Sequence, residues 1–244
     1  MPENGNFEGL LDSGLGELGL SESAAGSIAY NKISALLEKY IAEIEAFNNA
    51  YGLVKVSGRE ELIVRHILDS ITPLGIIRQF INDLVQERVG SADSSMAPGG
   101  NIKIVDVGSG AGLPGIPLAV CLPDIEFTLM ERMGRRVGFL HNCIAVLGMR
   151  NLKIEEIDME KAEPGRFDIA VFRAFRPLTP DILKGLFRLL KPGGFLAAWK
   201  GRFEKAEEEM LAVKRVFPEI KWEIMPVVVP FLEDERHLTV IRAL

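Results

Sequence analysis

The sequence of 244 residues has few residues of the kinds that form cross-links or metal centres, with two cysteines and three histidines. Cys121 and Cys143 both fall in apolar segments of helical character, so we expect two buried thiols and no disulfide bridge. His66, His141 and His237 are scattered along the chain, without the spacing of a metal-ligand cluster. We therefore predict no bound metal.

Long hydrophobic runs are also missing. No apolar run approaches the ~20 residues that a membrane helix requires. The first residues are polar and rich in glycine, and they lack the basic start and apolar middle of a signal peptide. We expect a cytoplasmic protein that does not enter a membrane.

Positive charge is in deficit, because 28 lysines and arginines stand against 34 aspartates and glutamates. The formal net charge of −6 argues against a protein that coats DNA or RNA non-specifically. Any RNA partner must therefore bind to a local basic face of the protein. Hydrophobic residues make up 48% and charged residues 25%, which is typical of a soluble globular protein with a full core.

Glycine, in contrast, is concentrated in one stretch, residues 102–117, which reads I-K-I-V-D-V-G-S-G-A-G-L-P-G-I-P. A β-branched run is broken by Gly108, Gly110 and Gly112, and apolar residues resume from Gly115. This pattern predicts a buried strand, a glycine turn and the start of a helix. Glycine permits φ > 0 and lets a ligand lie against the main chain, and a helix N-terminus offers free N–H groups.

The frame of this turn is G-x-G-x-G-x-x-G, which differs from the dinucleotide-binding G-x-G-x-x-G. With Asp106 two positions before the first glycine, the stretch D-x-G-x-G-x-G after a strand resembles the AdoMet site of Rossmann-like methyltransferases. The resemblance implies that Asp106, Gly108, Gly110 and Gly112 surround the methionine and ribose part of the cofactor. The alternative is a tight strand-to-helix turn without a ligand.

The rest of the chain divides by composition and periodicity. Residues 1–20 read as a flexible N-terminal extension, 21–89 as a helical region, and 90–100 as a flexible connector. In residues 101–244, strands alternate with helices until two consecutive strands close the chain, and such strands must pair antiparallel. We predict an α/β, Rossmann-like domain with a mostly parallel seven-stranded sheet. The predicted strands lie near residues 102–107, 125–130, 151–157, 167–172, 195–199, 222–229 and 237–242.

Glu131 follows the second predicted strand, 131 − 108 = 23 positions after Gly108. This separation is close to the ~20 expected between a glycine turn and the carboxylate that binds a ribose. We predict Glu131 as the ribose ligand, with a solvated acid beside Arg132 as the alternative. Met159 and Glu160 follow the third strand, in the loop that reaches the adenine in methyltransferases of this architecture.

Arg132, Arg135 and Arg136 gather at the start of the next predicted helix, where cations oppose the helix dipole. Either RNA phosphates or nearby acids must pair with them. Lys200 and Arg202 follow the fifth strand, at the edge where ligands of open α/β sheets bind. All five side chains are candidates for contacts with RNA.

Arg173 follows the fourth strand and is predicted at the mouth of the site. His66 and Asp69, three residues apart, share one face of a helix and either contact a substrate base or brace the domain. Asp69, Arg173 and Lys200 are our positioning candidates. We assign no residue as a general acid or base.

Four stretches together resemble the family of ribosomal small-subunit methyltransferase G, also called glucose-inhibited division protein B. They are L-I-V-R-H-I-L-D-S-I, D-V-G-S-G-A-G-L-P-G-I-P, R-A-F and E-R-H-L-T-V-I. The resemblance implies a class I fold and AdoMet-dependent methylation of N7 of a guanine in 16S ribosomal RNA, as free RNA or in the small ribosomal subunit. We predict no DNA or membrane partner, and we take a monomer as the default.

Carried over residue by residue, the resemblance places cofactor contacts at Gly108, Leu113, Met159, Glu160 and Arg173. This chain departs from the family pattern in two places. It has G-L-V at 52–54 where the family has N-L-T, and a glutamate at 131 where the family has an aspartate, which keeps the carboxylate.

Guanine N7 carries an in-plane lone pair and no proton, so methyl transfer to it by in-line displacement requires no general base. Positioning alone lowers such a barrier by up to roughly 7–11 kcal/mol. Asp69 is a candidate for gripping the guanine edge. The alternatives are an AdoMet-dependent methyltransferase acting on another RNA or a small molecule, a nicotinamide-dependent oxidoreductase, and a non-catalytic AdoMet-binding or RNA-binding subunit.

Overall fold

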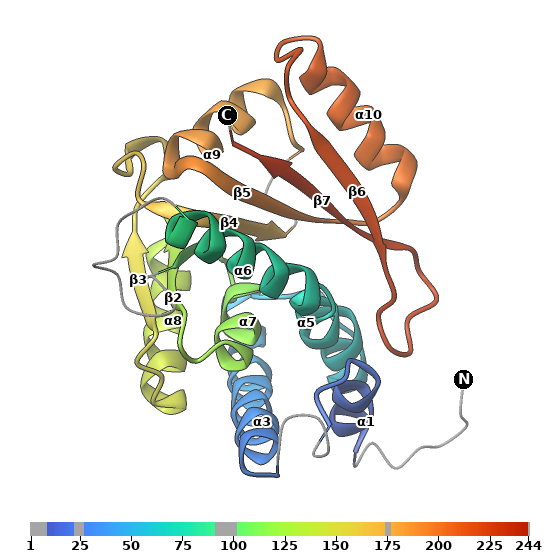
Figure 1. Cartoon of the computed structure of the whole chain (residues 1–244). Helices are drawn as coiled ribbons and strands as arrows, with labels where there is room; N and C mark the ends of the chain where they lie inside the picture. Colours follow the sequence, from blue (N-terminus) through green and yellow to red (C-terminus); the bar gives the residue numbers. More distant parts are fainter. Residues whose placement is uncertain (1–8, 22–26, 91–101, 174–176, 244) are drawn as a thin grey trace.

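The computed structural model describes residues 9–21, 27–90, 102–173 and 177–243 (Figure 1). They form one mixed sheet with helices on both faces. The strands are β1 (Lys103–Val107), β2 (Glu126–Glu131), β3 (Leu152–Glu156), β4 (Phe167–Arg173), β5 (Leu190–Lys200), β6 (Trp222–Val227) and β7 (Arg236–Arg242). Their order across the sheet is β3-β2-β1-β4-β5-β7-β6. β1 to β5 pair in parallel, and β7 runs antiparallel to both β5 and β6. The predicted fold class is confirmed.

The helices before the sheet are α1 (Leu10–Glu17), α3 (Ser27–Tyr51), α4 (Arg59–Leu62), η1 (Ile63–Leu68), α5 (Asp69–Ile71) and α6 (Leu74–Gly90). Those within the sheet domain are α7 (Gly115–Cys121), α8 (Gly134–Leu147), η2 (Met159–Lys161), α9 (Pro180–Leu189) and α10 (Phe203–Lys214). α4, η1 and α5 follow one another directly, and η1 is a π-helical turn between two α-helical pieces. At the start of α9 the Thr179 hydroxyl caps the helix, since it accepts from Ile182 N at 3.4 Å.

The two faces of the sheet are both covered, and the alternation of β4 shows how. Ile169 and Val171 pack in the core formed with the N-terminal helices, α7 and α8. Ala170 and Phe172 pack in a second core formed with α9 and α10. All four are buried. Because parallel strands are covered on both faces, residues 169–172 of this strand form a continuous apolar run in the sequence.

The prediction of a flexible segment over residues 1–20 is wrong for the part that the structure describes. α1 occupies Leu10–Glu17, and Leu11, Leu15 and Leu20 are buried in the core. Glycine and glutamate give this segment a polar composition, yet its leucines recur at helical spacing and form one apolar stripe. Residues 1–8 and the predicted connector, except Gly90 at the end of α6, lie outside the described residues.

Asp168 joins the sheet at the amino ends of the parallel strands. Its carboxylate is fully buried and accepts from Lys103 N of β1 at 2.7 Å. Lys191 Nζ of β5 lies 2.9 Å from Oδ1, and Arg88 of α6 also pairs with this oxygen. A buried carboxylate is stable when it is paired and hydrogen-bonded in this way. Three strands and α6 are therefore locked together at this edge.

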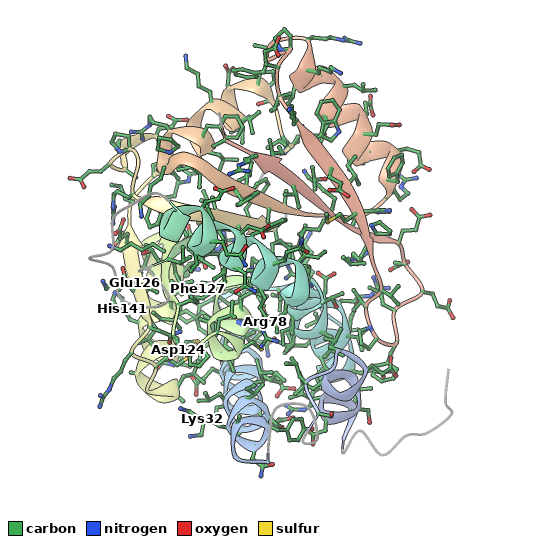
Figure 2. All side chains as sticks on the ribbon, in the orientation of Figure 1. Lys32, Arg78, Asp124, Glu126, Phe127 and His141 are labelled. Atoms are coloured by element: carbon green, nitrogen blue, oxygen red, sulfur yellow. The ribbon has the colours of Figure 1, made fainter. Side chains whose placement is uncertain are left out.

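Among the described residues, the cysteines and histidines belong to no group of side chains that could hold a metal ion. Cys121 and Cys143 are buried free thiols, as predicted, and burial raises the pKa of each to about 12. His141 is exposed on α8 (Figure 2), whereas His66 lies in η1 and His237 on β7. Of these histidines, only His66 and its surroundings enter the site described next.

Candidate functional site

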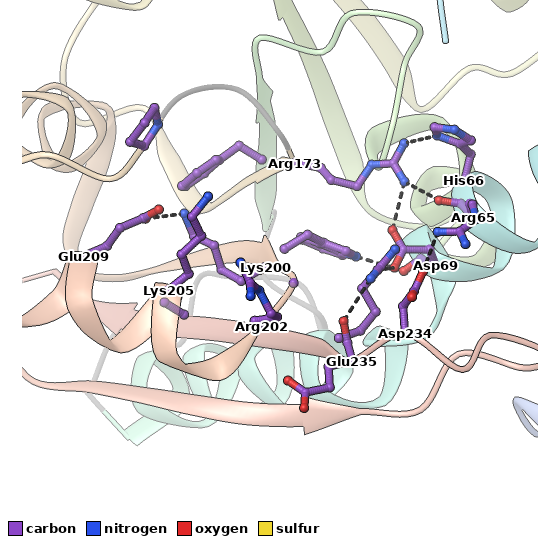
Figure 3. Close-up of a pocket in the computed structure, with 16 residues that line it drawn as sticks. Arg65, His66, Asp69, Arg173, Lys200, Arg202, Lys205, Glu209, Asp234 and Glu235 are labelled. Atoms are coloured by element: carbon purple, nitrogen blue, oxygen red, sulfur yellow. Dashed lines mark hydrogen bonds and ion pairs between the residues drawn. The ribbon is translucent and has the colours of Figure 1, made fainter. Parts of the chain in front are cut away.

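Two cavities open at the edge of the sheet where the parallel strands end. The first, here called the small cavity, has a volume of about 180 Å³ and lies beyond the ends of β1, β2 and β3. The second, the large cavity, has a volume of about 1080 Å³ and lies beyond the ends of β4 and β5 and the start of β7 (Figure 3). β1 and β4 are neighbours in the sheet, so the two cavities flank one boundary between strands. In open α/β sheets, ligands bind at such a reversal of strand order.

The glycine loop borders the small cavity. Gly108, Gly110 and Gly112 have φ values of 70°, 61° and 94°, in the left-handed region that side chains rarely occupy. A Cβ at Gly112 would also lie 2.4 Å from Ile116 Cδ1. The loop is tied to β2, because Gly108 N donates to the Met130 carbonyl at 2.9 Å. The predicted strand, turn and helix are confirmed.

Asp106 holds the loop from inside. Its Oδ2 accepts from the Ser109 hydroxyl at 2.7 Å and from Gly115 N at 2.9 Å, which joins the two ends of the turn. Oδ1 has no hydrogen-bond partner among the described residues. Burial raises the pKa of Asp106 to about 6. The residue lines neither cavity, so its predicted contact with a cofactor stays a prediction.

Tyr40 of α3 supports the loop from the N-terminal region. Its hydroxyl donates to the Ala111 carbonyl at 2.6 Å, across 71 residues of chain. Tyr40 is fully buried, and burial raises its pKa well above the ordinary value. The conformation of the glycine loop therefore depends on a helix from outside the sheet domain.

Glu131 lies at the end of β2 in the wall of the small cavity and is 4% exposed. Its Oε2 accepts from Gly110 N at 2.9 Å. Its Oε1 accepts from the main-chain N–H groups of Arg132 and Met133, each at 2.9 Å. Three backbone donors thus hold the carboxylate at the end of β2, where we predicted a ribose ligand. The carboxylate oxygens can still accept a further hydrogen bond.

The three arginines at the start of α8 have different surroundings. Arg136 Nη1 lies 3.7 Å from Glu131 Oε2, so a nearby acid is its partner. Arg132 lines the small cavity and is exposed, and Arg135 is exposed beside it. These two remain candidates for contacts with RNA.

The remaining walls of the small cavity come from the segment after β3. Met159 lines it, and its contact with the cofactor stays a prediction; Ile157 and Asp158, which we did not predict, line it as well. Glu160 is exposed and Leu113 is buried, and neither lines this cavity. Ile157 and Asp158 directly precede Met159, so their position after a strand was the available signal.

Asp69 lies at the wall of the large cavity, where it braces two arginines. Its Oδ2 accepts from Arg173 Nη1 at 2.9 Å, and its Oδ1 accepts from Arg236 Nε at 3.1 Å (Figure 3). Its main-chain carbonyl accepts from the indole of Trp199 at 2.9 Å. The structure thus brings Asp69 and Arg173 together, and both carboxylate oxygens are occupied by guanidinium groups.

Arg173 is held by η1 as well. Its Nη1 donates to the Arg65 carbonyl at 3.0 Å, and its Nη2 lies 2.7 Å from His66 Nδ1. A guanidinium only donates, so Nδ1 of His66 accepts and the imidazole is neutral. Burial and the charge of Arg173 lower the pKa of His66 to about 4. Ala174 and Phe175, which follow in the R-A-F stretch, lie outside the described residues.

The large cavity carries more positive than negative side chains. The cations are Arg65, Arg173, Lys200, Arg202, Lys205 and Arg236, and the carboxylates are Asp69, Glu209, Asp234 and Glu235. Arg65 pairs with Asp234 and Lys200 pairs with Glu209, each at 2.5 Å. Arg202 and Lys205 are exposed and have no ion-pair partner within the described part of the chain. The excess positive charge therefore lies at the rim formed by the start of α10.

Several residues of the large cavity were not predicted from the sequence, among them Arg65, Trp199, Lys205, Glu209 and Arg236. β7 runs antiparallel, so its first residues lie at the edge where the parallel strands end. Arg236 belongs to the E-R-H stretch, which contributed to the family resemblance without a role for the arginine. The antiparallel direction of the last strand was the signal that could have placed it.

This sheet order, the glycine turn after β1 and the carboxylate that ends β2 define a Rossmann-like methyltransferase of class I. The family model described as GidB, rRNA small subunit methyltransferase G, matches residues 33–239. The chain belongs to this family.

Relatives with the name "Ribosomal RNA small subunit methyltransferase G" match most of the chain. The protein of Treponema denticola is 39% identical over 247 residues, which cover 96% of this chain and 93% of the relative. That of Treponema pallidum strain Nichols is 37% identical, with 86% of this chain and 85% of the relative covered. That of Stenotrophomonas maltophilia is 32% identical, with 95% and 92% covered.

Proposed function

We propose that the protein transfers a methyl group from AdoMet to N7 of a guanine in 16S ribosomal RNA. In this proposal AdoMet occupies the small cavity and the guanine enters the large cavity. The observation that carries it is the position of the two cavities on either side of the β1–β4 boundary, in a chain of the rRNA small subunit methyltransferase G family.

The residues that line the small cavity suit the chemistry of AdoMet. Ile157, Met133 and Met159 supply apolar walls for an adenine ring, and Glu131 supplies a carboxylate for the ribose hydroxyls. The glycine loop offers main chain without side chains to the methionine part. AdoMet, when bound, supplies an electrophilic methyl group on a sulfonium centre.

On the acceptor side, the chain positions the base and does not activate it. Guanine N7 has its lone pair in the ring plane and carries no proton, so no general base is required. Arg173 is fixed by Asp69 and His66 at the boundary between the cavities, where it orients the base. Asp69 holds Arg173 and Arg236 in place with its two oxygens, and in this proposal its own contact with the guanine edge uses the remaining lone pairs. Such preorganisation accounts for up to roughly 7–11 kcal/mol of barrier lowering.

The RNA backbone meets the rim of the large cavity. Arg202 and Lys205 are exposed cations there, and phosphate contacts of this kind position a nucleic acid without reading its sequence. A local basic rim explains how a protein with a formal net charge of −6 can bind an RNA substrate.

Among the helices that the structure describes, none has the length and apolar character to cross a membrane.

The test is transfer of radiolabelled methyl from AdoMet to small ribosomal subunits that lack the modification, followed by mapping of the labelled nucleotide. We expect label at N7 of a single guanine in 16S RNA. Label on a small molecule and none on RNA, with AdoMet bound, would move the function to the small-molecule alternative. Naked 16S RNA in a parallel reaction distinguishes free RNA from the assembled subunit as the substrate.

A further inference from the structure

Helix α1 lies outside the residues that the family model matches, 33–239, yet it is part of the core. It packs on η1, the π-helical turn that carries Arg65 and His66. The approach is close at Gly14, where a Cβ would lie 2.4 Å from Leu68 Cδ1. Leu68, the last residue of η1, is itself fully buried.

The same helix is tied to α3. Asp12 Oδ1 accepts from the Tyr30 hydroxyl at 2.9 Å and from the Ser34 hydroxyl at 2.7 Å. Leu15, on the next turn of α1, is fully buried in the same core. α1 therefore joins α3 to the back of η1, and α3 also supports the glycine loop through Tyr40.

The opposite side of the η1–α5 segment faces the large cavity. His66 and the Arg65 carbonyl hold Arg173, and Asp69, the residue after Leu68, holds both Arg173 and Arg236. π-helical turns are rare and are found frequently at functional sites. The elements that pack against η1 hold it in place, and α1 is one of them.

We propose that α1 is a positioning element of the acceptor site, which fixes η1 and thereby places His66 and Asp69 against Arg173. The proposal rests on the proposed function for its kinetic consequence, whereas its structural consequence, a fixed His66–Arg173 contact, is measurable without any substrate. If α1 contributed only buried area to the core, loosening α1 would lower the stability of the fold but would leave the His66–Arg173 contact unchanged.

The test compares two leucine truncations. Leu15→Ala loosens α1, and Leu189→Ala is the matched control, because Leu189 is also fully buried but lies at the end of α9 and lines neither cavity. For Leu15→Ala we expect kcat/KM for small ribosomal subunits to fall about tenfold, with the Kd for AdoMet within about twofold of wild type. Leu189→Ala lowers the melting temperature comparably and leaves both constants unchanged.

The substrate-free readout is the NMR titration of the His66 imidazole. In the wild type its pKa is about 4, and loosening the contact with Arg173 in Leu15→Ala moves it upward, toward the ordinary value of 6.5. Leu189→Ala does not move it. An unchanged His66 titration in Leu15→Ala, or equal kinetic losses in both variants, would overturn the proposal. If the wild type methylates no RNA, the proposed function fails while this titration still decides the role of α1.

A second variant covers the case in which Leu15→Ala does not fold. Asp12→Ala removes the bonds to Tyr30 and Ser34 from an exposed side chain, without opening the core. We expect the same direction at smaller size, about threefold in kcat/KM, with the upward shift of the His66 titration. No shift in this folded variant would also count against the proposal.

Discussion

The carboxylate of Asp69 and the guanidinium of Arg173 join the N-terminal helical region to the end of β4, at 2.9 Å and across 104 residues of chain. Both side chains are largely buried, at 5% and 14% exposure. Removing one partner of a buried pair leaves the other charge uncompensated, which is strongly destabilising. The acceptor site therefore depends on how the N-terminal helical region docks against the end of β4. The local sequence of neither segment determines that contact.

Asp69→Asn is expected to disable the acceptor site more than the cofactor site. In the amide an NH2 donor replaces one of the two carboxylate oxygens, so one of Arg173 and Arg236 faces a donor in place of its acceptor. We expect kcat/KM for RNA to fall about 100-fold, while AdoMet affinity measured by calorimetry stays within about twofold. Glu87→Gln, at an exposed ion pair with Arg242, is the control and should match the wild type. Full activity of Asp69→Asn would contradict the role assigned to this pair.

Glu131→Gln is expected to weaken AdoMet binding. The charged acceptor for the ribose hydroxyls is lost, and charge-assisted hydrogen bonds are roughly twice as strong as neutral ones. We expect the Kd for AdoMet to rise about tenfold, or about 1.4 kcal/mol. Glu163→Gln removes an exposed carboxylate that lines neither cavity, and it serves as the matched control. Equal affinities of wild type and Glu131→Gln would exclude this carboxylate as a cofactor ligand.

Asp106→Asn is expected to change how stability depends on pH. The folded-state pKa of about 6 lies above the ordinary value of 3.8, so the folded state holds this proton more tightly than the unfolded chain. The contribution of Asp106 to stability is complete below pH 3.8 and is lost as the pH rises through about 6. The asparagine cannot ionise and keeps a carbonyl acceptor for Ser109 and Gly115.

Urea unfolding of both proteins between pH 4 and pH 7 measures this effect. The free energy of unfolding of Asp106→Asn relative to wild type should increase by about 2 kcal/mol across that range. Taking the difference between the two proteins removes the titration of the other groups, including His66, whose lowered pKa gives a slope of opposite sign. A difference that does not change with pH would show that Asp106 titrates normally.

The double variant Arg202→Glu with Lys205→Glu is expected to weaken RNA binding in a salt-dependent way. Each phosphate contact on a single strand contributes about 0.7 to the slope of log K against log salt. Loss of both contacts should reduce that slope by about 1.4 and leave AdoMet affinity unchanged. The charge reversal Arg135→Glu tests the second predicted RNA surface, beside the small cavity. If methylation survives there and fails at the rim of the large cavity, the rim is the RNA surface.

The small cavity was largely accessible to sequence reasoning because its parts are local. The glycine turn directly follows β1, Glu131 ends β2, and Met159 follows β3, so each signal lies within a few residues of a strand end. Their meeting follows from the parallel order of the strands. Glu160 shows the limit of this reasoning, since a neighbour in sequence is exposed and does not line the cavity.

The large cavity was less accessible because it is assembled from distant segments. Asp69 and Arg236 are 167 residues apart, and their bond depends on both the docking of η1–α5 and the antiparallel return of β7. No local sequence pattern predicts either of these two arrangements. Helix α1 was missed for a different reason, because the glycines and charges of this segment obscured its buried leucines, Leu11 and Leu15 in the helix and Leu20 after it.

The bond from Tyr40 to the Ala111 carbonyl has a consequence for how the molecule opens. Amide hydrogens exchange with solvent only when their segment unfolds locally, and cooperative units open together. Separation of α3 from the sheet breaks the support of the glycine loop, so a ligand held by that loop shifts the opening equilibrium of the helix as well. Protection of the α3 amides, in a helix that lines neither cavity, thereby becomes a measure of cofactor occupancy.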